Sequence, residues 1–212
     1  MTSTVARPGR IASGAQQKIL AFASLIVLLV FFSLASPNFL QTANILAILQ
    51  ATSVNGVLAI AATLVIITGG IDLSVGTLMT FTAVTAGVVL TYWGMPLPLG
   101  ILAAIAAGVT SGFISGTLVA RMKIPPFIAT LGMMLILKGL SLVISGTKPI
   151  YFNDTPSFPL LSTGSLIGGV IPGLPVPNGV VILFVLALII SWVLNRTVLG
   201  RYCFALGSNE EA

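Results

Sequence analysis

Three long stretches of this chain contain no acidic or basic side chain. They run from Ile19 to Ile71, from Leu73 to Ala120 and from Thr155 to Asn195. Each stretch is longer than the roughly 20 apolar residues with which a helix crosses a bilayer. Only 6% of the 212 residues are charged and 57% are hydrophobic, whereas a soluble domain carries about 25% charged residues. The chain is therefore predicted to fold in a membrane.

The membrane-spanning elements are predicted to be helices, because these stretches lack the alternation of apolar and polar residues that membrane barrels show. Glycine and proline residues divide the apolar sequence into successive spans. Six spans are expected: 19–36, 45–68, 71–91, 97–120, 126–146 and 179–195. The predicted fold class is an all-α polytopic membrane protein, with a transmembrane domain over residues 19–195.

The positions of the basic residues predict the orientation of these spans. One group precedes the first span, and two more groups follow the fourth and the sixth spans: Arg7, Arg10, Lys18; Arg121, Lys123; Arg196, Arg201. Cytoplasmic loops carry an excess of Lys and Arg. Residues 1–18 are therefore expected in the cytoplasm, and a loop at about 147–178 is expected to face outward.

Composition also excludes several classes of function. The net charge is +5, but the basic residues are scattered and form no face for nucleic acid. The chain has one cysteine, Cys203, and no histidine, so no intrachain disulfide, histidine-based triad or zinc site is expected, and no metal or cofactor. Four acidic residues without a paired arrangement disfavour an intramembrane enzyme.

The most informative motif is TGGIDLSVG, which begins at Thr68. Glycines are expected to break the helical structure here: Gly69, Gly70 and Gly76. An aspartate between apolar spans is costly and tends to be functional or paired. Asp72 either caps the following helix or lines a path for solute. The candidate residues of such a path or gate are Asn55, Thr68, Asp72, Ser74 and Thr77.

Two further features lie within the predicted spans. Lys138 lies about 11 residues into the fifth span, where it could snorkel outward, bond to carbonyls at a helix end or pair with Asp72. Small residues recur every four positions in the fourth span and allow another helix to approach closely, either in this subunit or in a dimer. They are Gly108, Gly112 and Gly116, extended by Ala104 and Ala120.

Three segments carry a resemblance to a known family. They are ITGGIDLSVG, KIPPFIATLGMMLILKGLSLV and TVLGRYCFALGSNEEA. Together they resemble the ribose/xylose/arabinose/galactose permease family of ABC importers, most of all its ribose branch. The resemblance covers nearly the whole chain after about Leu25, and the glycine–aspartate–serine signature is its most specific part.

The resemblance implies a larger assembly in the bacterial cytoplasmic membrane. Such permeases have about ten helices, so about four are expected beyond Ala212. They work as a pair of permease subunits, expected here to be a homodimer in lipid, with cytoplasmic ABC ATPase subunits and a periplasmic sugar-binding protein. Residues 196–212 would begin the cytoplasmic loop that couples the permease to the ATPase. The implied coupling residues are Gly207, Asn209, Glu210, Glu211 and Ala212.

The function expected from these features is ATP-driven import of a monosaccharide, with ribose favoured. The sequence holds no phosphate-binding motif of the type G-x-x-x-x-G-K-[ST], so ATP hydrolysis is assigned to a partner. Two alternatives stay open. One is a permease of the same superfamily for another sugar, a branched-chain amino acid or a nucleoside. The other is an ion-coupled secondary transporter, in which Asp72 would be the coupling site.

Overall fold

The computed structural model describes residues 14–171 and 173–208. All regular elements in these residues are helices, and six are long and apolar enough to cross a membrane. They match the predicted spans to within a few residues and confirm the all-α polytopic fold. These helices are α1 (Gly14–Ala35), α2 (Thr42–Ile67), α3 (Val75–Gly87) with its π-helical continuation η1 (Val88–Tyr92), α4 (Leu97–Ala120), α5 (Pro126–Ser145) and α8 (Asn178–Arg196).

Three details differ from the prediction. The third span begins at Val75 and not at residue 71, because the chain between α2 and α3 is extended. The predicted loop at 147–178 contains two short helices, α6 (Ser157–Thr163) and α7 (Leu166–Val170). The segment after the sixth span forms α9 (Val198–Ser208). Short helices of this kind are too brief to show a clear apolar period, so their sequences read as loop.

The chain divides into two compact units, residues 1–47 and 48–212. The described part of the first unit holds α1, a turn and the start of α2. Side chains satisfy this turn: Gln41 Nε2 donates to Asn38 Oδ1 at 2.7 Å, and Asn44 Nδ2 donates to the Phe39 carbonyl at 2.7 Å. The Phe39 ring stacks on Phe32 with 5.8 Å between ring centroids. These contacts, all within the first unit, hold the geometry of the turn.

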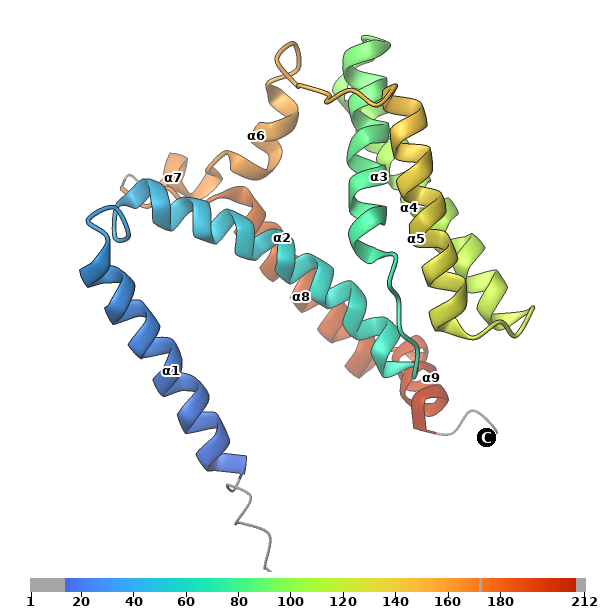
Figure 1. The fold of residues 1–212 in the computed structure, drawn as a ribbon, viewed down its shortest axis with the longest axis horizontal. Helices are drawn as coiled ribbons and strands as arrows, with labels where there is room; N and C mark the ends of the chain where they lie inside the picture. Colours follow the sequence, from blue (N-terminus) through green and yellow to red (C-terminus); the bar gives the residue numbers. More distant parts are fainter. Residues whose placement is uncertain (1–13, 172, 209–212) are drawn as a thin grey trace, which may run out of the picture. The chain divides into compact units, whose positions relative to one another are not determined.

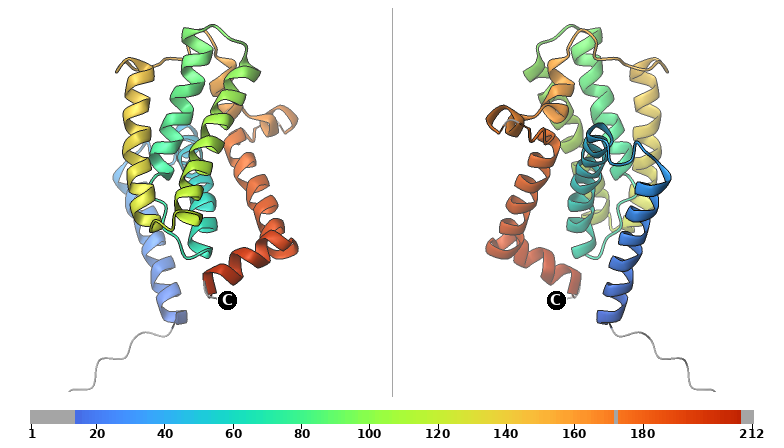
Figure 2. Two further views of the ribbon diagram at one scale, coloured as in Figure 1. Left: turned by 90° about the vertical axis from the view of Figure 1, so that its right-hand side faces the viewer. Right: turned by 90° about the vertical axis from the view of Figure 1, so that its left-hand side faces the viewer.

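The core of the second unit is a bundle of α3, α4 and α5, which stand side by side in Figures 1 and 2. Leu90 of η1 and Leu137 of α5 are each only 2% exposed. Gly100 of α4 lets Leu90 approach so closely that a Cβ at residue 100 would overlap the leucine side chain. Burying each such leucine contributes about 1.5–3 kcal/mol. This end of the bundle is therefore a packed apolar core.

Helices α2, α6 and α8 of the second unit meet at a polar contact that we call the Gly179 junction, made by Gln50, Ser53, Ser162 and Gly179. Gln50 Nε2 of α2 bonds to Ser162 Oγ of α6. Gly179, at the start of α8, is buried, and a Cβ there would lie 2.7 Å from Ser53 Oγ. The junction joins α2, α6 and α8, and α9 in turn packs against α8.

Large apolar side chains point away from the packed elements of the second unit. Phe113, Val143 and Leu188 are 72%, 75% and 71% exposed. Apolar area of this kind is costly in water and costs nothing against lipid tails. The outer surface therefore fits a bilayer as its solvent, in agreement with the composition.

Candidate functional site

The break between α2 and α3 begins with a glycine turn. Gly69 has φ +81°, a left-handed conformation that is common at helix C-termini and that glycine adopts without steric cost. Its N–H donates to the Ile66 carbonyl at 2.9 Å, and the Gly70 N–H donates to the Val65 carbonyl at 3.0 Å. These bonds close α2 and release an extended segment toward α3, visible in Figure 1.

Asp72 lies in this extended segment, directly ahead of α3. Its Oδ1 accepts hydrogen bonds from the Ser74 backbone N–H at 2.7 Å and from Ser74 Oγ at 2.6 Å. Ser74 is only 3% exposed, and Thr77 Oγ1 donates to its carbonyl at 2.9 Å. The carboxylate therefore lies at the N-terminal end of α3, where the helix dipole favours negative charge.

Thr130 of α5 holds the same segment from the other side. Its Oγ1 accepts from the Leu73 N–H at 3.2 Å and lies 3.2 Å from the Ile71 carbonyl and 2.8 Å from the Pro126 carbonyl. Thr130 is 5% exposed. This buried hydroxyl thus supplies an acceptor to the Leu73 N–H, which the extended chain leaves without a helical bond, and donates its one hydrogen to a neighbouring carbonyl.

A cavity of about 700 Å³ lies beside the break. Its volume is within the range of about 300–1,000 Å³ that is usual for small-molecule sites. Residues from α2, the break, α3, α4, the α4–α5 turn, α5 and α9 form its wall. The polar side chains of the wall are Thr68, Asp72, Ser74, Ser111, Ser115, Lys123 and Thr130.

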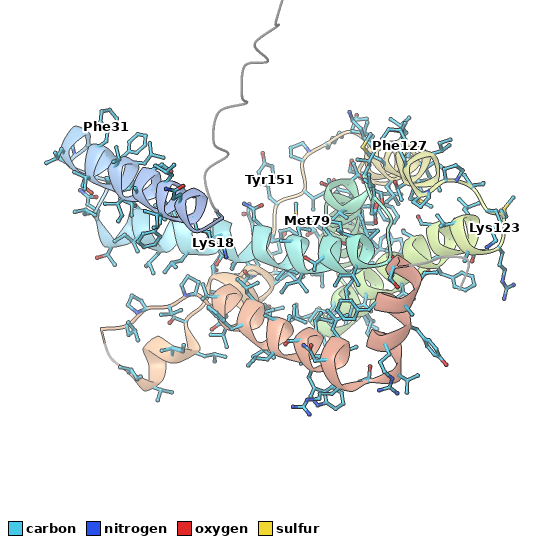
Figure 3. The ribbon with its side chains drawn as sticks, turned by 90° about the horizontal axis from the view of Figure 1, so that it is seen from below. Lys18, Phe31, Met79, Lys123, Phe127 and Tyr151 are labelled. Carbon is cyan, nitrogen blue, oxygen red and sulfur yellow. The ribbon has the colours of Figure 1, made fainter. Side chains whose placement is uncertain are left out.

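The cavity is bordered at the α4–α5 turn by exposed residues. Lys123, which Figure 3 labels on this turn, is exposed and has φ +56°. Gly116 of α4 and Leu206 of α9 also line the cavity and are exposed. Asp72 and Lys123 are the two charged side chains of the described wall. Hydroxyl groups outnumber charges here, so the wall is mainly neutral. Four of the five hydroxyls donate to partners within the chain and face the cavity chiefly as acceptors: Thr68, Ser74, Ser111 and Thr130.

The structure brings together part of the predicted solute path. Thr68, Asp72 and Ser74 line the cavity together with Gly69 and Gly70. Two other residues of the predicted path do not line the cavity: Asn55 is exposed on α2, and Thr77 lies within α3. Gly76, predicted as a break glycine, instead lies inside the first turn of α3.

Sequence reasoning missed Ser111, Ser115 and Thr130. Ser111 and Ser115 are four residues apart on α4, next to the predicted glycine stripe. That spacing places them on one helix face, but only the fold shows that this face meets the break.

The glycine stripe of α4 has two different environments. A Cβ at Gly108 would lie 3.6 Å from Thr82 Cγ2 of α3, an ordinary packing distance. A Cβ at Gly112 or Gly116 would meet no heavy atom within 4 Å, and both glycines line the cavity. Helix packing within the described chain therefore occurs at Gly108, and the other two glycines keep the cavity wide.

Lys138 and Asp72 do not form the ion pair that the sequence left open. Asp72 is bonded to Ser74, and Lys138 is exposed on α5. Among the implied coupling residues, Gly207 belongs to α9. The other four, Asn209, Glu210, Glu211 and Ala212, lie outside the described residues.

Comparison with known proteins places this sequence in a family. Residues 44–212 match the family described as branched-chain amino acid transport system / permease component. The ribose import permease of Escherichia coli K12 is 39% identical over 189 residues, which cover 89% of this chain and 57% of the relative. The ribose import permease of Bacillus subtilis is 38% identical over 202 residues, covering 94% of this chain and 60% of the relative.

A third relative is the galactofuranose transporter permease of Escherichia coli K12, 38% identical over 220 residues, which cover 100% of this chain and 60% of the relative. The chain thus spans somewhat more than half the length of these relatives. No solved structure matches it. The matched range and these identities show that the chain, a multi-pass bacterial membrane protein, belongs to the permease component family of branched-chain amino acid transport systems.

Proposed function

We propose that this chain forms the translocating part of an ATP-driven importer for a monosaccharide, with ribose as the favoured solute. The hydroxyl-lined cavity beside the break in the helical bundle carries this proposal. A sugar presents several hydroxyl groups and no charge. It needs neutral donors and acceptors, and five of the seven polar side chains in the wall are Ser or Thr.

The two charges of the wall also fit a neutral solute. The Asp72 carboxylate already accepts two hydrogen bonds from Ser74, which leaves it little need of a cationic ligand. Lys123 lies on an exposed turn, where water solvates the ammonium group. The printed names of the relatives, which include ribose and galactofuranose, support a sugar and leave its identity to experiment.

The energy for transport is assigned to partners. The 212 residues contain no phosphate-binding loop, so we assign ATP hydrolysis to cytoplasmic ABC ATPase subunits. A periplasmic sugar-binding protein would deliver the solute, and a second permease subunit would complete the pathway. In this arrangement residues 1–18 and 196–212 face the cytoplasm, and the segment 147–178 faces outward. The coupling residues would approach the ATPase: Gly207, Asn209, Glu210, Glu211 and Ala212.

Transport would then follow alternating access. ATP and solute must each bind one conformation better than the other, because a ligand shifts a conformational equilibrium only by its difference in affinity. The cavity borders the α4–α5 turn, at the same end of the unit as α9 (Figure 1). With the basic residues inside, this is the arrangement of an inward-facing state.

The test is uptake of radiolabelled ribose by cells that lack their own ribose permease. The complete reading frame is expressed with its ATPase and its binding protein, and then with the ATPase deleted. We expect accumulation that disappears without the ATPase. Accumulation of another sugar would keep the mechanism and replace the solute. Uptake that persists without the ATPase and collapses with the proton gradient would establish an ion-coupled transporter instead.

A further inference from the structure

Helices α2 and α8 run in the same direction and enclose a groove near their C-terminal ends (Figure 1). The two helices touch at Gly56, where an added Cβ would lie 2.7 Å from Leu183 Cδ1. Beyond this contact a second cavity, of about 240 Å³, lies between them, and we call it the α2–α8 groove. Its wall combines apolar and polar side chains: Ile60, Ile190 and Leu194; Thr63, Ser191 and Asn195.

The polar side chains of the groove are exposed although they belong to two spans. Thr63 Oγ1 donates to the Ala59 carbonyl at 2.7 Å. Asn195 Nδ2 donates to the Ser191 carbonyl at 2.8 Å and reaches Ser191 Oγ at 3.4 Å. The Ser191 hydroxyl accepts in this contact, and its own hydrogen has no acceptor among the described residues. Lipid tails offer no acceptor either, so this donor requires a polar group from outside the chain.

A basic residue lies at the mouth of the groove. Arg196 is the last residue of α8, directly after Asn195, and it is exposed. Nine basic side chains accompany only four acidic ones in the sequence, so most of the cations need an anion from elsewhere. A guanidinium group binds phosphate oxygens with two parallel hydrogen bonds. The groove thus carries an unsatisfied neutral donor and, at its mouth, a cation suited to phosphate.

The spacing of these two groups matches the layers of a membrane. Ser191 and Arg196 are five residues apart, which is about 7.5 Å along the helix axis. The head-group region is about 5–7.5 Å thick on each side, since a bilayer of about 40–45 Å has a hydrocarbon core of about 30 Å. With Arg196 at the level of the phosphates, Ser191 lies where the ester carbonyls meet the hydrocarbon. Trp192 is 62% exposed at this level, as is usual for tryptophan at a membrane interface.

We propose that the α2–α8 groove binds one phospholipid with an anionic head group from the inner leaflet. Arg196 donates to the phosphate, Ser191 donates to an ester carbonyl, and one acyl chain lies against the apolar wall formed by Ile60, Ile190 and Leu194. An anionic head group is preferred because the ammonium group of a zwitterionic lipid competes with Arg196 for the phosphate. The leaflet follows from the orientation proposed above, whereas the site itself does not depend on which solute is transported.

A lipid fits these features better than a helix from another subunit. The backbone groups of a helix are already paired within it, so a helix could satisfy Ser191 only through a polar side chain placed at that depth. A phospholipid brings an ester carbonyl and a phosphate together, one for Ser191 and one for Arg196. The groove is also narrow, with about one third of the volume of the cavity beside the break, which suits a single acyl chain.

The experiment measures lipid binding to the purified complete permease by native mass spectrometry. Phosphatidylglycerol and phosphatidylcholine are titrated separately, and we expect the first to bind more tightly. Arg196→Gln should lower the affinity for phosphatidylglycerol about fivefold, because one basic side chain near an anionic lipid is lost, and should leave phosphatidylcholine nearly unchanged. Arg121→Gln is the matched control, since Arg121 is an exposed basic residue at the end of α4 and lines neither cavity. It should leave both affinities unchanged.

Two further variants test the groove without a change of charge. Ser191→Ala should lower the affinity for both lipids about threefold through loss of one hydrogen bond, and it serves if Arg196→Gln does not fold. Ala187→Leu adds a side chain to the wall of the groove and should also weaken both lipids. A phosphatidylglycerol with a photoreactive acyl chain should label α2 and α8 in the original protein and lose this labelling in Ala187→Leu.

Three results would overturn the proposal. Equal affinities of the original protein for the two lipids would show that the site does not select an anionic head group. Equal losses in Arg196→Gln and Arg121→Gln would assign the effect to overall surface charge. Photolabelling that avoids α2 and α8 would show that another helix covers the groove. None of these measurements uses sugar or ATP, so failure of the lipid site leaves the proposed function intact, and the reverse also holds.

Discussion

Glycines at two places in the second unit have opposite effects on how closely other elements approach. At the Gly179 junction an added Cβ would lie 2.7 Å from Ser53 Oγ and 2.9 Å from Ser162 Oγ. At Gly112 and Gly116 it would meet nothing within 4 Å. In the first place the absent side chain allows three helices to touch, and in the second it leaves space for a ligand. Residue type alone therefore does not say whether a small residue closes or opens a membrane bundle.

The two places also differ in how polar groups are satisfied. At the break, Thr130 and Asp72 supply partners to the exposed backbone. At the Gly179 junction, Gln50 Oε1 is buried and accepts no hydrogen bond from the described residues. A buried acceptor without a partner costs about 1–3 kcal/mol. The polar groups named at the break are thus paired, whereas the junction buries one acceptor without a partner among the described residues.

The largest loss of stability is expected from a substitution at the Gly179 junction. Gly179→Val should destabilise the protein by about 3 kcal/mol, because its branched side chain would overpack the contact with Ser53 and Ser162. Gly112→Val should change stability by about 1 kcal/mol or less, since only helix propensity is altered. Titration with sodium dodecyl sulfate in mixed micelles measures both. Equal losses would show that the two glycines are equivalent.

A smaller loss is expected at the break. Thr130→Val keeps the shape of the side chain and removes the hydroxyl, which leaves the Leu73 N–H unpaired at a cost of about 2 kcal/mol. Faster hydrogen exchange of the Leu73 amide should accompany the loss. Thr130→Ser restores the hydroxyl and should recover most of the protection. Unchanged exchange in Thr130→Val would mean that another group bonds this amide.

The hydrogen bond between Gln50 and Ser162 should contribute less to stability than the Thr130 hydroxyl. Side-chain hydrogen bonds in membrane proteins are worth about 0.6 kcal/mol on average and about 1.7 kcal/mol at most. A double-mutant cycle with Gln50→Leu and Ser162→Ala should give a coupling free energy in this range. A coupling near zero would show that the junction is held by shape alone.

The smallest effect is expected for a residue that the sequence placed in the solute path. Asn55→Ala should change stability by no more than about 0.5 kcal/mol and ribose uptake by less than about twofold, because Asn55 is exposed and does not line the cavity. Ser115→Ala should lower uptake by about three- to tenfold through loss of one hydrogen bond to the solute. A larger loss of uptake in Asn55→Ala than in Ser115→Ala would indicate that the solute path follows α2 and not the cavity.

The sequence predicts the spans well because each depends on local properties. Charge-free length, and the prolines before α4 and α5, fix where helices begin and end. The break at Gly69 was equally predictable, since it needs only glycine and a following Asp. The site was harder, because Ser111 and Thr130 reach it from helices that are distant along the chain.

Distances along the chain also explain why the predicted path residues do not all lie together. Asn55 is 13 residues before Thr68, and about 1.5 Å of rise per residue separates them by about 20 Å along α2. Both residues have suitable chemistry, but they cannot serve the same cavity. The glycine stripe divides in the same way: its period indicates one helix face, and only the fold shows that this face meets α3 at Gly108 and empty space at Gly112 and Gly116.

The late start of α3 has an electrical consequence. With η1 it comprises 18 residues against 24 in α4, or about 27 Å against about 36 Å of helix. If water fills the cavity, the membrane voltage falls across the length of α3 and η1, which is the shorter of the two distances. Each elementary charge that crosses it exchanges about 2.3 kcal/mol per 100 mV with the field. A neutral sugar exchanges nothing, so its passage would be insensitive to voltage.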